Sequence, residues 1–486
     1  MRTNFSFIGG ELMGLLCATE LFTFTGNGAS STLKPSSRTE EERLWKLPPQ
    51  SIEHFTPNPL LHFARSAPAF DVIISSDGRR IAYAVWKGHK QCVVVDGQPE
   101  RVYDGIALGL LTFSPDSQQV AYAAKTGAKW TVVVGGRPGP TYDGVGEASL
   151  VFSPDSKRVA YVAQDGAKQV VVVDGQPGHA FDGIGKAIFS PDSRHVAYRA
   201  KQDALWMVVL DEHPGPAYDR IGEHSPIFSS DGKRLAYATK RGKERRVVVD
   251  EKEGQPYEII GDGSLRFSPD GKHFLYAAST GDHRMLVVDG RPGAAYADIE
   301  VGSPFFSPDS KRLAYAAKSG GKWLAVVDDI PGPTFDGIGQ YSPIFSPDSQ
   351  RVAYIARKGK AQLVVLDGQP GSEFDGIADD SLIFSPNSQR LAYVAQRGNK
   401  QLVVVDGKPE PVYDGISARS PVFSPDSQRV AYDAQKGKER LVVVDGQPGP
   451  PYDGVVNGAL TFDHDGSLRY FACKGGFFYR VHNAPK

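Results

Sequence analysis

The chain has 486 residues, and its 55 basic and 56 acidic side chains nearly cancel. This balance excludes the strong net field that draws a protein to nucleic acid or to an anionic membrane surface. The 3 cysteines, Cys17, Cys92 and Cys473, lack the paired spacing of a disulfide framework or a zinc site. No apolar run reaches the roughly 20 residues that span a bilayer. We therefore expect no nucleic-acid partner, no membrane span, no bound metal and no cofactor.

The first residues resemble a weak secretory signal. Arg2 precedes an apolar stretch, but Glu11 and Glu20 interrupt it and no small-x-small cleavage site follows. Residues 27–50 are rich in Ser, Thr, Glu and Pro, a composition that cannot bury enough apolar surface to order itself. We interpret residues 1–58 as a flexible leader, and favour a cytoplasmic over an exported or periplasmic location.

From about residue 70 onward the sequence repeats a tight-turn motif, Ser-Pro-Asp-Ser or a close variant of it. Successive copies are 39 residues apart, except between Asp155 and Asp192, where the step is 37. A fixed period in this range with strand-like composition is typical of a repeat array or a propeller. The acidic or amide residues that mark the 11 copies are Asp77, Asp116, Asp155, Asp192, Asp231, Asp270, Asp309, Asp348, Asn387, Asp426 and Asp465.

One repeat unit, residues 342–377, predicts four short strands in chain order. Strand A at 343–346 leads into the Ser-Pro-Asp-Ser turn, in which proline presets the second position and Asp bonds nearby backbone. Strand B at 351–356 is rich in β-branched and aromatic residues, and a glycine-centred turn follows it. Strand C at 362–366 is an unbroken aliphatic run, and strand D lies at 372–377. A four-stranded antiparallel meander of this length is one propeller blade.

The recurrent core Phe-Ser-Pro-Asp-Ser/Gly-x-Arg-Val/Leu-Ala-Tyr, as in 152–161, 306–315 and 423–432, resembles the TolB-like, WD-related β-propeller repeat family. The resemblance covers roughly residues 70–486. It implies a toroid of radially arranged blades that serves mainly in protein interaction, and in some members stands beside a peptidase domain. Repeats fill this chain from residue 70 on, so they leave no room for such a domain.

Counting strands predicts how the ring closes. The eleventh repeat lacks a strand D, and an open outer edge is one that natural sheets avoid. Residues 60–65 stand in register for a strand D directly before the first strand A, so we expect them to complete blade eleven. The predicted fold is all-β, with residues 59–486 forming one closed ring of eleven four-stranded blades of about 39 residues each. Two smaller propellers are the alternative.

Comparing the repeats separates residues that recur in every unit, which we interpret as structural, from residues that vary, which are candidates for function. The recurrent Asp is explained by turn capping, and Arg158, Arg312, Arg351 and Arg429 are interpreted as contacts between blades. The turns between strands B and C are rich in Lys and Arg, and the loops between strands D and A vary most from repeat to repeat. Variable loops on a rigid scaffold are where recognition usually lies. The candidate binding residues are Glu147, Lys186, Glu223, His224, Tyr341, Asp379, Asp380 and Arg419.

Two functions remain open. We favour a non-enzymatic scaffold, a monomer, that binds a protein or peptide through the variable loop face. The sequence has no Gly-x-Ser-x-Gly elbow, no His-Glu-x-x-His and no phosphate-binding loop. The alternative is a hydrolase or lyase that acts on a polysaccharide or peptide at the central channel, for which Asp379 and Asp380 with His224 are the only candidates.

Overall fold

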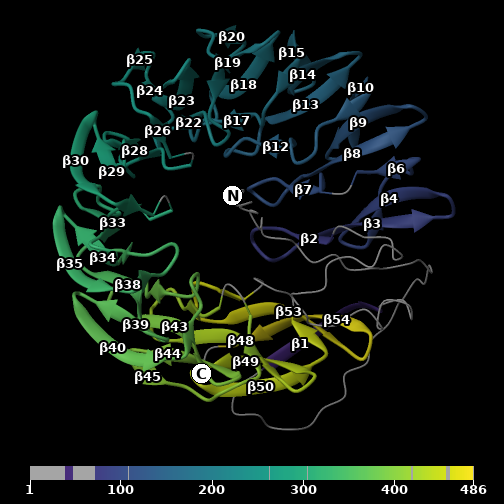
Figure 1. Ribbon diagram of the computed structural model, residues 1–486. Coiled ribbons are helices and arrows are strands. Elements are labelled where there is room, and N and C mark those ends of the chain that lie inside the picture. The colour runs from purple at the N-terminus through teal and green to yellow at the C-terminus, as the bar shows by residue number, and fades with distance from the viewer. Residues whose placement is uncertain are drawn as a thin grey trace.

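The structure is a computed structural model that describes residues 39–46, 72–107, 109–261, 263–300, 302–303, 305–417, 420–455 and 460–484. These residues form 54 β-strands and no helix. The strands make eleven antiparallel sheets that stand side by side around one central channel (Figure 1). The predicted all-β fold, a single β-propeller of eleven blades, is confirmed.

Each blade has four strand positions, which we call a to d from the channel outward, and we number the blades 1 to 11 along the chain. Strands b and c form a long hairpin in every blade. The b strands are β3 (Ile81–Lys87), β8 (Val120–Thr126), β13 (Val159–Asp165), β18 (Val196–Gln202), β23 (Leu235–Arg241), β28 (Phe274–Thr280), β33 (Leu313–Ser319), β38 (Val352–Lys358), β43 (Leu391–Arg397), β48 (Val430–Lys436) and β53 (Leu468–Lys474). The c strands are β4 (Lys90–Val95), β9 (Lys129–Val134), β14 (Lys168–Val173), β19 (Leu205–Leu210), β24 (Glu244–Val249), β29 (His283–Val288), β34 (Lys322–Val327), β39 (Ala361–Leu366), β44 (Lys400–Val405), β49 (Glu439–Val444) and β54 (Phe477–Asn483).

In blades 2 to 11 the inner strand a consists of two short pieces that both pair with strand b, and in blade 1 the described inner strand is β2 alone. The first pieces are β6 (Gly105–Ile106), β11 (Gly144–Val145), β16 (Gly183–Ile184), β21 (Arg220–Ile221), β26 (Ile259–Ile260), β31 (Asp298–Ile299), β36 (Gly337–Ile338), β41 (Gly376–Ile377), β46 (Gly415–Ile416) and β51 (Gly454–Val455). The second pieces are β2 (Val72–Ile74), β7 (Thr112–Phe113), β12 (Val151–Phe152), β17 (Ile188–Phe189), β22 (Ile227–Phe228), β27 (Arg266–Phe267), β32 (Phe305–Phe306), β37 (Ile344–Phe345), β42 (Ile383–Phe384), β47 (Val422–Phe423) and β52 (Thr461–Phe462).

The outer strand d carries proline near its start in nine blades, which removes a backbone N–H from an exposed edge and so protects that edge against pairing with other chains. These strands are β5 (Gln98–Pro99), β10 (Arg137–Tyr142), β15 (Gln176–Phe181), β20 (His213–Pro214), β30 (Arg291–Tyr296), β35 (Ile330–Phe335), β40 (Gln369–Phe374), β45 (Lys408–Pro409) and β50 (Gln447–Tyr452). The outer strand of blade 5 is β25 (Lys252–Glu253), which is charged instead.

The apolar core is divided among the interfaces between blades. One buried cluster joins Ile355 and Val364 of blade 8 to Tyr393 and Leu402 of blade 9. The same aromatic contact joins each blade to the following one, from blade 1 through blade 11. A Tyr or Phe ring after the c strand of one blade packs edge to face on the strand b tyrosine of the next blade, with ring centroids 5.9–6.3 Å apart. Stability is therefore shared between neighbouring blades, as in other repeat proteins.

The last blade is completed by a strand from the start of the chain. The outer strand of blade 11 is β1 (Thr39–Lys46), which pairs antiparallel with β54. We had assigned these residues to a flexible leader and the closing role to residues 60–65, which lie outside the described residues. An outer strand is solvent-exposed on its free side, so the polar side chains of Glu41, Glu42 and Arg43 do not prevent strand formation there.

Candidate functional site

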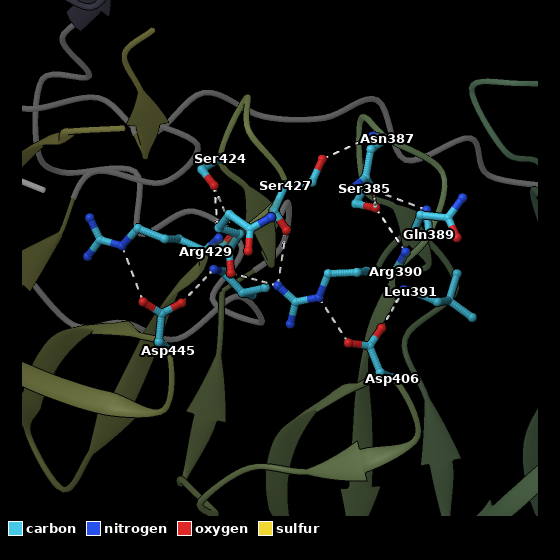
Figure 2. A network of polar contacts seen from close by, with 12 residues as sticks. Ser385, Asn387, Gln389, Arg390, Leu391, Asp406, Ser424, Ser427, Arg429 and Asp445 are labelled. Carbon is cyan, nitrogen blue, oxygen red and sulfur yellow. Dashed lines mark hydrogen bonds and ion pairs between the residues drawn. The ribbon is translucent and has the colours of Figure 1, made fainter. Parts of the chain in front are cut away.

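The repeated polar residues on one face of the ring form hydrogen bonds within the fold. Figure 2 shows two copies of the network, in blades 9 and 10. Ser385 Oγ donates to Asn387 Oδ1 over 2.7 Å, and that oxygen also accepts the backbone N–H of Gln389. The backbone N–H of Asn387 donates to Ser427 Oγ of blade 10 at 3.0 Å. The motif thus caps its own turn and links it to the next blade, so the interpretation of the recurrent Asp as a turn cap is confirmed.

The recurrent arginine joins blades, as predicted. Arg351 Nε donates to Asp367 Oδ2 at 2.9 Å within blade 8, and Nη1 donates to the Gln389 carbonyl of blade 9 at 3.2 Å. Its guanidinium also lies over the ring of Phe384, 5.8 Å from the centroid. The recurrent arginine is therefore bonded within the ring itself.

The opposite face carries the turns between strands b and c, and its positive charge is smaller than the sequence suggests. Lys129 Nζ pairs with Asp143 Oδ1 at 2.7 Å, and the other oxygen of Asp143 accepts the backbone N–H of Gly166 in the next blade's hairpin. The bond from Lys129 holds the pKa of Asp143 below its usual value. Lys90, Lys168, Lys322 and Lys400 pair with the corresponding aspartates in the same way.

A β-turn interrupts the inner strand and projects into the channel. We had predicted strand D at 372–377, but β40 ends at Phe374, and Gly376–Ile377 starts the inner strand of blade 9. Between the two pieces of strand a the chain leaves strand b and returns to it. Because both ends of this loop are paired to strand b, its apex points away from strand b toward the channel. We call these loops the channel turns: 146–149, 222–225, 339–342 and 378–381, together with the described residues 261 and 263–264, 300 and 302–303, and 417 and 420 of three further loops.

Each channel turn is anchored from both sides by one residue of strand b. In blade 3 the Val162 carbonyl accepts the N–H of Gly146 at 2.9 Å, and the Val162 N–H donates to Ser149 Oγ at 3.2 Å. Ser149 Oγ also donates to the Gly146 carbonyl at 2.7 Å, closing the turn. The corresponding serines Ser225, Ser264, Ser303, Ser342, Ser381 and Ser420 accept from strand b in the same way. Where the turn leaves strand b, the strand b N–H has no backbone carbonyl of strand a to bond, and the serine hydroxyl accepts that hydrogen bond instead.

The structure places most of the predicted binding residues at the two central positions of these turns. They are Glu147 in blade 3, Glu223 and His224 in blade 5, Tyr341 in blade 8, and Asp379 and Asp380 in blade 9, all exposed. Lys186 is exposed in the loop of blade 4, which is shorter by two residues. Arg419 lies outside the described residues.

Neighbouring channel turns touch one another. The ring of His224 lies 3.6 Å from the position that a Cβ on Gly263 of blade 6 would occupy, and the ring of Tyr341 lies 3.9 Å from that position on Gly302 of blade 7. Asp379 Oδ1 lies 3.0 Å from the Cβ position of Gly339 in blade 8. Partial desolvation of Asp379, with the nearby charge of Asp380, raises the pKa of this carboxyl. These contacts join adjacent turns along the channel wall.

The candidates for an enzymatic site are not brought together. His224 belongs to blade 5, whereas Asp379 and Asp380 belong to blade 9, with three blades between them. Among the residues that the structure describes, no group of three or more His, Cys, Asp or Glu side chains could hold a metal ion. The described part of the chain also contains no helix long and apolar enough to cross a membrane.

The candidate binding residues left out two residue groups at the channel. Glu300 belongs to the variable loops but was not among the candidates, and it starts the turn of blade 7, where most repeats have Gly or Ala. In blade 10, Asp433 is 2% exposed, accepts Ser417 Oγ at 2.5 Å and accepts Arg440 Nε at 3.0 Å. Burial raises the pKa of Asp433, and the guanidinium of Arg440 opposes that rise. The three side chains tie the blade 10 turn to strands b and c of its own blade.

The similarity of this chain to known proteins lies among solved structures. No family model matches the sequence, and no curated protein matches it. Among solved structures, a crystal structure of the eukaryotic initiation factor matches with 13% identity and a TM-score of 0.38, over 68% of this chain and 95% of that one. The propeller domain of the trilobed protease from Pyrococcus furiosus matches with 14% identity and a TM-score of 0.27, over 54% and 92%. TolB from Acinetobacter baumannii matches with 17% identity and a TM-score of 0.26, over 60% and 77%. The chain is thus similar to TolB and to other β-propellers.

Proposed function

We propose that the protein is a non-enzymatic scaffold that binds a protein or peptide partner at its channel turns. The observation that carries this proposal is the division of labour within the repeat. The recurrent Ser, Asp and Arg side chains hydrogen-bond within the ring, and the recurrent Tyr rings pack between blades. The variable side chains instead occupy turns that strand b holds from both sides. A rigid frame with variable exposed positions is the usual arrangement of a recognition surface.

The charge of these turns indicates the chemistry of the partner. The described channel turns present the acidic residues Glu147, Glu223, Glu300, Asp379 and Asp380. Among the described residues of these loops, Lys186 in blade 4 is the only Lys or Arg. Complementary charge favours encounter and register at an interface. We therefore propose a partner segment that carries Lys or Arg, with the exposed ring of Tyr341 as an aromatic contact.

Selection from a random peptide library on the immobilised full chain tests the proposal. We expect the selected peptides to be enriched in Lys and Arg, and to bind the variant Tyr341→Ala/Asp379→Asn/Asp380→Asn at least tenfold more weakly. The matched control is Lys358→Ala/Lys360→Ala at the exposed b–c turn of blade 8, which should bind as the unaltered chain does. A selection without enrichment, or peptides that bind both variants equally, would refute it. If the unaltered chain cleaves a peptide or polysaccharide from a substrate panel, and Asp380→Ala abolishes this activity, the hydrolase or lyase alternative is favoured.

A further inference from the structure

The outer edge of blade 11 differs from the other ten outer edges in how its last strand is supplied. In blades 1 to 10, strand d follows strand c through a two-residue turn, for example Asp406 and Gly407 between β44 and β45. In blade 11, strand d is β1, and residues 47–71 separate β1 from β2 in blade 1. The position of β1 is therefore not dictated by a tight turn.

The described contacts that hold β1 lie on β54 and on the end of β50. The backbone pairs Thr39 through Lys46 with β54, and the register places Glu42 opposite Arg480. Arg480 Nη1 donates to Glu42 Oε2 at 2.9 Å, and Tyr452 Oη donates to Glu41 Oε1 at 2.8 Å. The guanidinium of Arg43 lies over the ring of Phe477, 3.3 Å from its centroid. All of these contacts are specified by residues 39–46 themselves, whichever molecule supplies them.

We propose that the edge formed by β54 is an exchangeable strand-acceptor site, and that its second occupant is the segment 39–46 of another copy of this chain. The acceptor side also supports ring closure, because Arg480 Nη2 donates to the Arg79 carbonyl of blade 1 at 2.7 Å. An unoccupied β54 would expose a row of unpaired backbone groups, which makes the edge a template for an added strand. A second copy offers the matching backbone length, the two acidic partners and the arginine.

Chain connectivity permits the exchange. Residues 47–71 can span at most about 90 Å when fully extended, so they do not confine β1 to its own ring. The same contacts form in both arrangements, and their balance is set by the effective concentration at which β1, tethered by residues 47–71, meets the β54 edge of its own chain. The closed monomer therefore prevails in dilute solution. Strand-exchanged dimers form when rings fold together at high concentration, as in domain swapping.

A disulfide between two molecules tests this exchange directly. One full-length chain carries Glu42→Cys and the other carries Arg480→Cys, both in a Cys17→Ser background. Residues that face each other in antiparallel strands have Cβ atoms about 4.5–5.5 Å apart, close enough for a disulfide after a small adjustment. The two chains are unfolded, mixed in equal amounts, refolded together and oxidised. We expect a covalent dimer of twice the 52.6 kDa chain mass on a non-reducing gel. Its fraction should rise with the protein concentration during refolding.

Two controls make every outcome decisive. The double variant Glu42→Cys/Arg480→Cys in one chain should form the crosslink within that chain, which verifies the register. The mixture of Glu42→Cys with Lys438→Cys, at an exposed b–c turn of blade 10, measures random oxidation. If the test mixture yields no more dimer than this second control while the double variant crosslinks internally, β1 stays in its own chain and the proposal is wrong. If the double variant fails to crosslink, the pairing on which the proposal rests is wrong.

Discussion

Arg390 and Asp406 connect two turns of blade 9 and carry the connection into blade 10. Arg390 Nε donates to Asp406 Oδ2 at 2.9 Å, and Asp406 Oδ1 accepts the backbone N–H of Leu391 at 3.0 Å. Arg390 Nη1 reaches the carbonyls of Ser427 and Gln428 in blade 10, at 3.1 and 2.7 Å (Figure 2). The side chains are 29% and 40% exposed, so water screens the pair, and we assign it a contribution of about 1 kcal/mol.

Replacing this arginine should loosen the interface between blades 9 and 10. We expect Arg390→Ala to lower the local free energy of opening by about 1 kcal/mol, because two carbonyls and one carboxylate lose their donor. Hydrogen exchange read out by mass spectrometry should show faster exchange in peptides of blades 9 and 10 and unchanged exchange in blades 4 and 5. The exposed neighbour Gln389 supplies the control, and Gln389→Ala should leave all peptides unchanged. Uniform acceleration around the ring would contradict this assignment.

Two blades carry histidine in place of this arginine. His195 Nδ1 contacts Asp211 Oδ2 at 2.6 Å and His273 Nδ1 contacts Asp289 Oδ2 at 2.7 Å. An imidazole is too short to add the arginine's bonds to backbone carbonyls of the next blade, although the ring of His273 lies 6.4 Å from the ring of Phe306 in blade 7, centroid to centroid. His195→Arg and His273→Arg should each stabilise the ring by about 0.5–1 kcal/mol, as consensus substitutions commonly do. The measurement is the denaturant midpoint of each variant. A lowered midpoint in both would show that the inter-blade bonds of arginine add nothing.

The Ser-Pro-Asp turns should make the ring sensitive to acid. Bonds from Ser346 Oγ and from the Gln350 backbone hold the pKa of Asp348 below its usual value. A lowered folded-state pKa means that the carboxylate stabilises the fold above its unfolded-state pKa of about 4, and that this contribution is lost as the pH falls through the folded-state value. The fold already contains a neutral counterpart, Asn387, with the same hydrogen bonds.

Asparagine substitutions should therefore reduce the acid sensitivity and spare neutral stability. We expect the variant with Asn at Asp155, Asp309, Asp348 and Asp426 to keep its denaturant midpoint near pH 7. The loss of midpoint between pH 4 and pH 2 should be smaller than in the unaltered chain. The reciprocal variant Asn387→Asp should show a steeper loss. Equal pH profiles for all three proteins would show that the turn carboxylates do not govern acid unfolding.

Tyr341 occupies a strained backbone position that blades 2 and 6 give to glycine. Its φ is 59°, and the corresponding residues include Gly263 with φ of 83° and Ala148 with φ of 49°. A side chain in this region costs roughly 1–2 kcal/mol. Glycine removes this cost, but its greater conformational freedom in the unfolded chain cancels part of the gain in folding free energy. We expect Tyr341→Gly to keep stability or raise it by up to about 1 kcal/mol, and to weaken binding of the selected peptides at least tenfold.

Ala148→Gly is the matched control for that substitution. It makes the same backbone change in blade 3 and removes only a methyl group, so it should affect stability similarly and leave peptide affinity unchanged. Thermal melting and peptide titration of the two variants give the comparison. If Tyr341→Gly lowers the melting temperature by more than a few degrees and binds peptide normally, Tyr341 is a packing residue and not a contact residue.

The repeat pattern predicted the ring, but it did not predict the strand that closes it. The period of the Ser-Pro-Asp turns determines the number of blades, and the four turn signals of each unit determine the strands b and c. The closing strand has no such signal, because β1 is an edge strand whose described side chains, Glu41, Glu42 and Arg43, are exposed. Its polar composition indicates disorder in isolation, and it becomes a strand through backbone pairing with β54.

The candidate site was predictable in its residues and not in its geometry. Comparing repeats isolates the variable positions, and six of them, including Tyr341 and Asp379, lie at the apices of channel turns. The turns themselves were read as simple loops between strands D and A, since pieces of inner strand two residues long, such as Gly376–Ile377, leave no periodic pattern. The neutralisation of basic hairpins was missed because Lys400 begins β44 whereas its partner Asp414, 14 residues later, lies between β45 and β46.

Site-specific photo-crosslinking is the measurement that tests the central claim most directly. A photoreactive phenylalanine analogue replaces Tyr341 in one protein and Lys360, at the b–c turn of the same blade, in another. Each protein is irradiated with the peptide selected on the unaltered chain. The account predicts a peptide adduct at position 341 that excess unlabelled peptide suppresses, and none at position 360. An adduct at position 360 without one at position 341 would show that the partner binds the b–c turns and not the channel turns.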